Sequence, residues 1–174
     1  AEERDTGKQR AAAAFTLLAD LLGSGGIQSI LGKELQLNSK KAIYTNAYYN
    51  GLSYDATNFS LIVVPDREVT LLEIETELDK IIDTFILNGI DDGHLERIKF
   101  QYKAHQIYSL DSSYSRARRF GVALTSGLTI EDVLAWPEVI QDIKPSEILA
   151  AAISLFKKES SVTGWIRKPV GESK

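Results

Sequence analysis

Cysteine and methionine are both absent from this sequence of 174 residues. Without cysteine there can be no disulfide, no thiolate nucleophile and no thiolate metal site, so thiol chemistry is excluded as the function. Because methionine is missing even at position 1, the first residue is not a translation start. We therefore interpret the sequence as a fragment or a processed product, which can hold only part of a site.

Histidine is nearly absent, since only His94 and His105 occur. On one continuous helix these two residues would stand roughly 16 Å apart, a distance that one metal ion cannot bridge. Neither belongs to a His-x-x-x-His, His-Glu-x-x-His or His-x-x-Glu-His pattern, which would place two imidazoles on one zinc. The Gly-x-Ser-x-Gly motif of serine nucleophiles is missing as well. We predict no catalytic residue and no metal ligand in this chain.

Long apolar segments and a large charge of one sign are missing too. No apolar run approaches the roughly 20 residues needed to cross a bilayer, and the first residues lack the apolar segment of a signal peptide. The formal net charge is -4 with 25% charged residues of both signs, which gives no electrostatic surface for nucleic acid or an anionic membrane. We expect a soluble chain with no nucleic-acid partner and no membrane insertion.

Glycine is concentrated at residues 23–26, and Gly32 and Lys33 follow shortly after. A phosphate-binding loop would need four residues between its last two glycines and a hydroxyl after the lysine. Here five residues intervene, and Glu34 occupies the hydroxyl position. We therefore interpret residues 23–26 as a turn that ends a helix rather than as a phosphate site.

Hydrophobic spacing and turn residues predict many helices and few strands. Apolar residues three and four apart mark helix faces, whereas runs of aromatic and β-branched residues mark strands. Together with glycine, proline and capping residues, these signals predict helices up to residue 23, at 27–36, at 71–88, from 91, at 113–126, from 129 and at 147–158, and strands at 42–49, 57–64 and 161–166.

This order of elements predicts the α+β class, a two-layer α/β domain in which helices pack on one face of a small, largely antiparallel sheet. The hydrophobic share of 44% is enough for one core in 174 residues. We expect residues 1–174 to form a single domain, part of a longer two-domain chain, with residues 1–10 flexible. We also expect further short strands that the sequence does not locate.

Tyrosine is concentrated around the first predicted strand, at Tyr44, Tyr48, Tyr49 and Tyr54. Tyrosine combines apolar contact area with a hydroxyl, which suits peptide recognition, but packing in the core or at a strand edge is the alternative use. Because residues an even number apart along a strand point to the same face, Tyr44 and Tyr48 are predicted to share one.

Five segments of the sequence resemble, in their order and spacing, segments of a known protein family. They are LLGSGGIQSIL at 21–31, GIDDGHLERIK at 89–99, ALTSGL at 123–128, IKPSEI at 143–148 and SVTG at 161–164. Together they resemble the carboxy-terminal, non-catalytic domain of the insulinase-type (pitrilysin-like) zinc peptidases, over nearly the whole chain from about Ala11 to Lys168. The first two are similar to the family's glycine turn between helices and to its Glu-Leu-x-x-x-Lys helix.

The resemblance implies a unit that pairs with a homologous catalytic domain or subunit to enclose a peptide substrate. Zinc and the catalytic glutamate would lie on that other unit, so no cofactor is expected in this chain. In the family, the glycine turn and the strand after the second helix face the peptide chamber. The resemblance therefore places Gly25, Gly26, Tyr44 and Tyr48 beside the substrate or partner, and makes this chain the substrate-enclosing half of a bacterial zinc endopeptidase.

One family feature is missing from the sequence. In many relatives an arginine and a tyrosine seven residues apart touch the bound peptide, and their positions correspond here to Gln36 and Ile43, with Tyr44 one residue later. Neither expected residue is present. The alternative function is therefore a non-catalytic scaffold or partner subunit that uses the same fold only to hold a partner.

Overall fold

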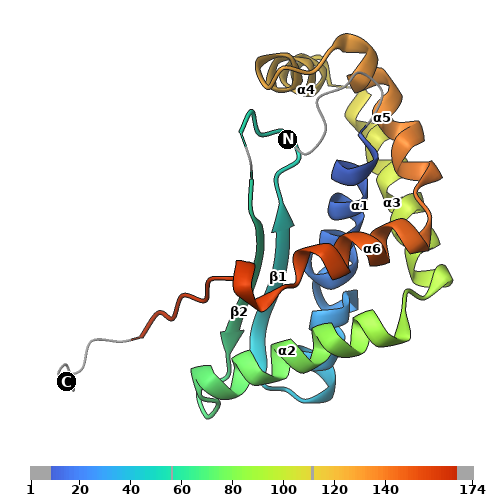
Figure 1. Cartoon of the computed structure of the whole chain (residues 1–174). Coiled ribbons are helices and arrows are strands. Elements are labelled where there is room, and N and C mark those ends of the chain that lie inside the picture. The colour runs from blue at the N-terminus through green and yellow to red at the C-terminus, as the bar shows by residue number, and fades with distance from the viewer. Residues whose placement is uncertain (1–8, 56, 111, 168–174) are drawn as a thin grey trace.

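The computed structural model describes residues 9–55, 57–110 and 112–167. In chain order its elements are α1 (Arg10–Ala19), η1 (Asp20–Ser24), η2 (Gly26–Gln28), η3 (Gly32–Asn38), β1 (Ala42–Tyr49), β2 (Phe59–Pro65), α2 (Leu71–Asn88), α3 (Asp92–Leu110), α4 (Ser113–Thr125), α5 (Ile130–Asp142), α6 (Pro145–Leu155) and η4 (Lys158–Ser160). Figure 1 shows the long helices gathered on one side of the β1–β2 hairpin. The predicted α+β class, a small antiparallel sheet with helices on one face, is confirmed.

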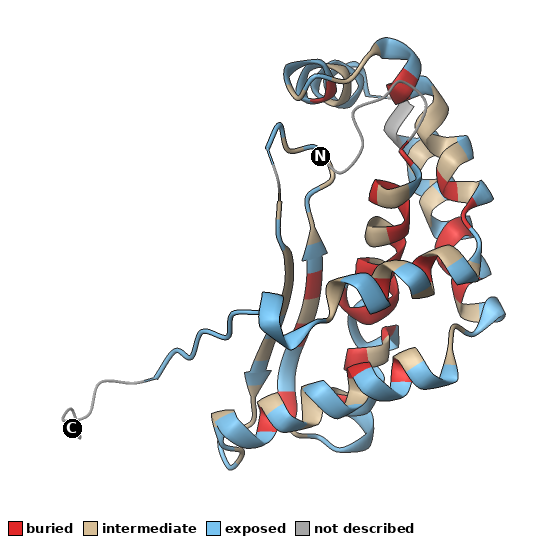
Figure 2. Cartoon of the chain, viewed as in Figure 1, coloured by how far each residue is buried: buried red, intermediate tan, exposed pale blue. Residues whose placement is uncertain are grey.

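The first helix lies at the centre of the core. It runs from α1 directly into the π-helical turn η1, and its side chains Leu17, Leu18, Leu21 and Leu22 are at most 1% exposed. Alanines at 12–14 keep the helix narrow, so that α6 and α5 can pack close beside it. A helix with apolar residues all round is stable only when it is covered on every side. Figure 2 shows this helix as the most continuously buried part of the chain.

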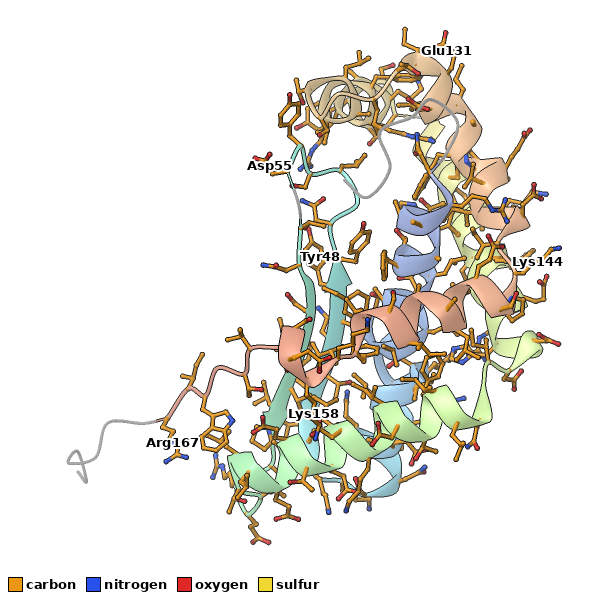
Figure 3. All side chains as sticks on the ribbon, viewed as in Figure 1. Tyr48, Asp55, Glu131, Lys144, Lys158 and Arg167 are labelled. Carbon is orange, nitrogen blue, oxygen red and sulfur yellow. The ribbon has the colours of Figure 1, made fainter. Side chains whose placement is uncertain are left out.

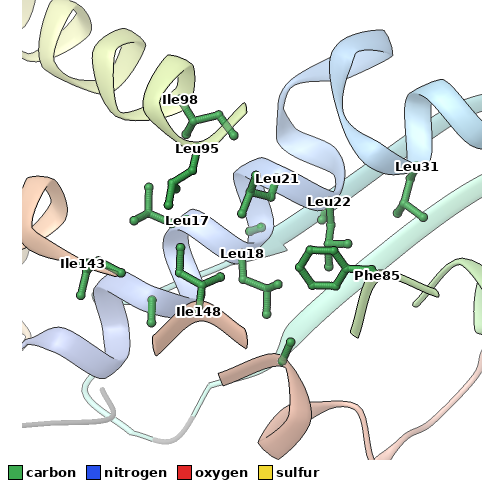
Figure 4. Close-up of a cluster of buried hydrophobic side chains, with 14 of the residues drawn as sticks. Leu17, Leu18, Leu21, Leu22, Leu31, Phe85, Leu95, Ile98, Ile143 and Ile148 are labelled. Carbon is green, nitrogen blue, oxygen red and sulfur yellow. The ribbon is translucent and has the colours of Figure 1, made fainter. Parts of the chain in front are cut away.

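Three later helices supply that cover. Phe85 comes from α2, Leu95 and Ile98 come from α3, and Ile148 comes from α6, and all four belong to the same buried cluster as the leucines of the first helix. Figure 4 shows these side chains arranged around Leu17 and its neighbours. The core therefore joins residues from both ends of the chain.

The hairpin covers the first helix from the remaining side. Alternation along β1 turns Thr45 and Ala47 toward the helices, where both are buried. The Tyr49 ring packs against Phe15 of α1 with 5.3 Å between ring centroids, and it also stacks on Phe59 of β2. Among the described residues β1 and β2 form the whole sheet, so its stability depends on this helical layer.

Gly23 determines how closely the first helix approaches the sheet. A Cβ atom at this position would lie 2.2 Å from the backbone nitrogen of Ala47, so only glycine fits. The Ser24 hydroxyl donates a hydrogen bond to the Ala47 carbonyl oxygen at 2.9 Å, which fixes the helix end on the edge of β1. Gly32 makes a second close approach, since its Cβ position lies 2.3 Å from the carbonyl oxygen of Gly26.

The second predicted helix begins later than expected. A short 3-10 turn, η2, occupies Gly26–Gln28, and the backbone is extended at Ser29. The Ser29 hydroxyl accepts a hydrogen bond from the Gly32 backbone nitrogen at 3.1 Å, so Ser29 acts as the cap of the helix that follows. This helix ends as the π-helical turn η3.

The predicted final strand at 161–166 is wrong. Residues 161–167 form no strand, and Val162 and Ile166 are 98% and 96% exposed. The alternating pattern is present, but no neighbouring strand among the described residues pairs with it. Instead, the Trp165 indole nitrogen donates to a Glu75 carboxylate oxygen of α2 at 3.1 Å. The further short strands that we expected are also absent from the described part of the chain.

Other boundaries differ only slightly from the prediction. The second strand begins at Phe59 rather than at residue 57, and α6 ends at Leu155 rather than at 158. The predicted turn at Gly89 has the expected positive φ of 76°. Of the terminal residues predicted to be flexible, 1–8 lie outside the described residues.

An ion pair joins the first helix to the last one. The Arg10 guanidinium donates to both carboxylate oxygens of Glu147, each at 2.7 Å, and also to the Asp142 carbonyl oxygen at 3.2 Å. This bidentate contact lowers the pKa of Glu147 to about 2. The pair therefore adds directional attraction to the apolar contact between α1 and α6.

We predict that Gly23→Ala lowers the free energy of unfolding by about 2 kcal/mol or more, because the added methyl group meets the backbone of β1 and forces the helix away. Denaturant unfolding monitored by circular dichroism measures the change. Gly25→Ala is the matched control, since its Cβ position has no atom nearer than 3.6 Å and its φ is -74°. Equal stability of the two variants would contradict the role of Gly23.

We predict that Glu147→Gln lowers the free energy of unfolding by roughly 0.5–1 kcal/mol at pH 7, because the pair is partly exposed to solvent. A folded-state pKa below the ordinary value stabilises the fold above pH 4.5, and this contribution is lost as the pH falls toward about 2. The difference between wild type and variant should therefore shrink below pH 4.5. Asp79→Asn, which removes a more exposed ion pair with Lys158, should leave stability unchanged.

Candidate functional site

The side of the hairpin that faces away from the helices carries a group of exposed aromatic and aliphatic side chains. Tyr44 and Tyr48 of β1 are 49% and 56% exposed, and Ile62 and Val64 of β2 are also exposed. Strand pairing places Tyr44 opposite Val64. Ile62 lies opposite Asn46, which is midway between the two tyrosines. We call these four residues the outer sheet face. Exposed apolar groups that gather in this way typically mark an interaction surface.

The prediction that Tyr44 and Tyr48 share one face of the strand is confirmed. Both rings lie outside the core, whereas Tyr49 packs inside it, so the packing alternative holds only for Tyr49. Figure 3 labels Tyr48 on β1. The sequence missed Ile62 and Val64, because their place beside the tyrosines depends on the register between the strands.

A β-bulge changes the direction of side chains at the start of β1. The register shifts between Ala42 and Tyr44, so that Ile43 is an extra residue in the strand. As a result Ile43 and Tyr44, which are neighbours in sequence, are both exposed, at 64% and 49%. The bulge therefore leaves Ile43 exposed beside Tyr44, whereas Tyr44 and Tyr48 share a face through the regular alternation that follows it.

The predicted glycine turn lies at the edge of the same strand. Gly25 and Gly26 are exposed, and Gly26 has a φ of 62° with open space around its Cβ position. The hydrogen bond from Ser24 holds this turn against Ala47, the residue that precedes Tyr48. The structure thus brings the turn and the strand together, with Gly23 rather than Gly25 or Gly26 making the tight contact.

Gln36 is held inside the domain. Its amide nitrogen donates a hydrogen bond to the Thr45 hydroxyl at 2.7 Å, and Thr45 is buried on the helical side of β1. Gln36 therefore fixes η3 on the strand. It occupies the position at which the resemblance implies an arginine.

The donor groups of the described residues do not fit a zinc ion. No cluster of three or more histidine, aspartate or glutamate side chains suited to a metal occurs among them. The backbone nitrogen of His94 donates to Asp91 at the start of α3, and burial lowers the pKa of the His94 imidazole. His105 is exposed on the same helix. The described residues therefore offer no set of ligands for zinc.

The fold of this chain is similar to that of several solved structures. A protease from Helicobacter pylori superposes with a TM-score of 0.78 at 23% identity over 87% of this chain. The peptidase M16 inactive domain from Pseudomonas fluorescens superposes with a TM-score of 0.65 at 16% identity over 84% of this chain. The chain shares the fold of these peptidase structures. The fold implied by the resemblance is therefore confirmed.

A third structure, assigned as a zinc protease of Bordetella pertussis Tohama I, gives a TM-score of 0.79 at 12% identity and covers 94% of this chain and 88% of its own. By contrast, this chain spans only 36% and 34% of the Helicobacter and Pseudomonas chains, about a third of their length. No family model matches the sequence, and no curated protein matches it. Within the described residues, no helix has the length and apolarity of a membrane span.

We predict that the chain does not bind zinc stoichiometrically, because a site needs about four convergent ligands and the two histidines are separated along α3. Equilibrium dialysis followed by metal analysis measures the bound zinc. The variant with both His94→Ala and His105→Ala is the control and should retain the same background amount. One zinc per chain that disappears in this variant would contradict the prediction.

Proposed function

We propose that this chain is the substrate-enclosing, non-catalytic half of a zinc metalloendopeptidase that degrades or processes peptides. In this proposal, zinc and the catalytic glutamate are supplied by a homologous catalytic domain, either on the same chain or on a partner subunit. The fold of a peptidase inactive domain supports it, together with two histidines whose spacing does not form the zinc motif. The enzyme as a whole would be a hydrolase, with this chain contributing binding rather than chemistry.

The outer sheet face is the observation that carries the proposal. Four exposed apolar side chains on a hairpin that is otherwise fixed by a helical layer offer a firm surface to a second molecule. Tyrosine is favoured at such surfaces because its ring buries a large area at little entropic cost, while its hydroxyl can bond to a peptide backbone. The glycine turn beside Tyr48 leaves its backbone groups accessible from the same strand edge.

The bulge offers an explanation for the missing tyrosine. The resemblance implies a peptide-contacting tyrosine at position 43, where this chain has isoleucine. Because Ile43 and Tyr44 both point outward, Tyr44 can present its ring to a peptide from one residue later. We propose that Tyr44 makes the peptide contact that the resemblance implies for a tyrosine at position 43.

The alternative is a non-catalytic scaffold or partner subunit of the same fold. The observation that favours it is Gln36, which stands in place of the arginine and is bonded to Thr45 within the domain. A chain that has lost the cationic contact to a peptide could still bind a homologous subunit. The two functions differ in whether adding the chain changes the rate of peptide cleavage.

We predict that mixing the chain with a homologous catalytic unit carrying a His-x-x-Glu-His motif raises the cleavage rate of an internally quenched peptide. Replacing both Tyr44 and Tyr48 with alanine should then reduce kcat/KM by about tenfold or more, because aromatic anchors dominate binding at such surfaces. The variant should keep its melting transition, since both rings are exposed.

The matched control is a variant with both Leu87→Ala and Phe100→Ala, which removes two exposed apolar side chains outside the outer sheet face. It should leave the cleavage rate unchanged. An unchanged rate in the mixture despite measured binding would favour the scaffold alternative. Full activity of the folded double tyrosine variant would remove the outer sheet face from the function.

A further inference from the structure

A separate cavity of about 820 Å³ opens on the helical side of the hairpin, where β1 leaves the sheet. Its walls come from α1, α3, α4, α5 and the turn after β1. None of the four residues of the outer sheet face lines it. Tyr48 and Tyr49 are consecutive, yet alternation points Tyr49 into this cavity and Tyr48 away from it. The volume lies within the usual range for small-ligand sites.

Aromatic rings form much of the cavity wall. Tyr49, Tyr102, Tyr114 and Trp136 come from four different elements and all line it. The Trp136 indole nitrogen donates a hydrogen bond to the Tyr102 hydroxyl, which holds these two rings together across α3 and α5. Burial raises the pKa of Tyr102, so its hydroxyl remains protonated over the physiological range. These walls favour an apolar or aromatic group as the ligand.

The charged groups of the cavity are predominantly cationic. Arg118 and Arg119 line it, and Asp132 is the single acidic residue that does. The Asp132 carboxylate accepts hydrogen bonds from the Thr129 backbone nitrogen and hydroxyl, both at 2.9 Å, and so serves as a helix cap. Arg119 donates to the Val133 carbonyl oxygen at 2.8 Å. Arg118 has no hydrogen-bond or ion-pair partner among the described residues.

A buried donor also lacks a partner among the described residues. Gln9 lines the cavity and is only 6% exposed, yet its side-chain nitrogen makes no hydrogen bond within the described part of the chain. Buried amide donors are nearly always bonded, because leaving one unpaired forfeits its hydration without replacement. The Gln9 amide at the cavity wall is therefore available to donate a hydrogen bond to an acceptor oxygen of a ligand.

We propose that this cavity binds a carboxylate group attached to an apolar body. Arg118 would bind the carboxylate, the Gln9 amide would donate to a carbonyl oxygen of the same ligand, and the aromatic wall would take its side chain. An amine would be disfavoured by the two arginines. A peptide is the ligand class because of the function proposed above, whereas the carboxylate follows from the cavity. It can be supplied by a peptide C-terminus or by an acidic side chain.

Trp136 provides a direct measurement of binding. The sequence holds two tryptophans, so Trp165→Phe leaves Trp136, in the cavity wall, as the sole source of indole fluorescence. This chain alone, without any catalytic unit, is titrated with acetyl-Leu-Phe as the free acid, with acetyl-Leu-Phe-amide, and with acetyl-Phe-Glu-amide. Calorimetry on the same three peptides gives the affinities independently of the fluorescence.

The free acid should bind at least about tenfold more tightly than acetyl-Leu-Phe-amide, as expected for loss of a charge-assisted hydrogen bond. Acetyl-Phe-Glu-amide identifies the source of the carboxylate: weak binding assigns the site to a peptide C-terminus, and binding equal to the free acid assigns it to any carboxylate beside an apolar group. Equal affinity for the free acid and its amide, or no binding of any of the peptides, would overturn the proposal.

Two variants test the named side chains. Arg118→Ala should weaken binding of the free acid about tenfold, whereas Arg116→Ala, on the same helix, should not, because Arg116 lines a different pocket and not this one. Equal weakening by both would reduce the effect to net charge and overturn the proposal. Gln9→Leu should raise the melting temperature of the free chain, since it removes an unpaired buried amide, and at the same time weaken binding. Unchanged affinity in Gln9→Leu would remove the amide from the site.

These measurements can fail independently of the proposed function. Binding to the isolated chain involves no cleavage, no zinc and no outer sheet face. Loss of cleavage on replacing Tyr44 and Tyr48, with the carboxylate preference intact, would separate the two sites. Retention of the cleavage effect without any carboxylate preference would leave the proposed function standing alone.

Discussion

The burial of the first helix on all sides is the constraint on which the rest of the molecule depends. Leu17, Leu18, Leu21 and Leu22 lie along one broad side of it, and the buried residues Ala12 and Ala19 lie on the other side, so no single neighbouring element can cover them all. The hairpin, α2, α3 and α6 each remove one part of this apolar surface from water. Since the hairpin is too small to be stable alone, both of its strands owe their position to this helix.

Sequence reasoning located the elements well where a local signal existed. The boundaries of β1 and α2 followed from composition and from turn residues such as Gly89, which have physical causes within a few neighbours. The strand predicted at 161–166 failed because alternation shows that a segment can pair but does not supply a partner. The cap at Ser29 was missed because a serine near glycines reads equally well as a turn residue.

The candidate site was predictable only in part, for a similar reason. The shared direction of Tyr44 and Tyr48 follows from strand geometry alone, and the structure agrees. The bulge at Ile43 and the alignment of Val64 with Tyr44 depend on strand pairing, which no single-sequence pattern specifies. The cavity could not be predicted from the sequence, because its walls come from segments as distant as Gln9 and Trp136.

Because side chains alternate along β1, one side of the strand packs on the core and the other side is exposed to solvent. Side chains such as Ala47 hold the strand on the first helix, while Tyr48, the next residue, remains available to another molecule. A surface fixed in this way loses little conformational freedom when it binds, which lowers the entropic cost of association. Changes to the outer side chains can therefore alter the proposed recognition while leaving the core packing intact.

Arg10 and Glu147 are 137 positions apart in the sequence, so their contact can form only after the ribosome has synthesised both segments. Synthesis releases the leucine-rich helix well before its last covering helix, α6. Contacts between such distant segments slow folding, and apolar surface stays exposed in the interval. Translation that stops before Ile148 would leave one side of this helix uncovered, and such a product would be a natural target for chaperones and proteases.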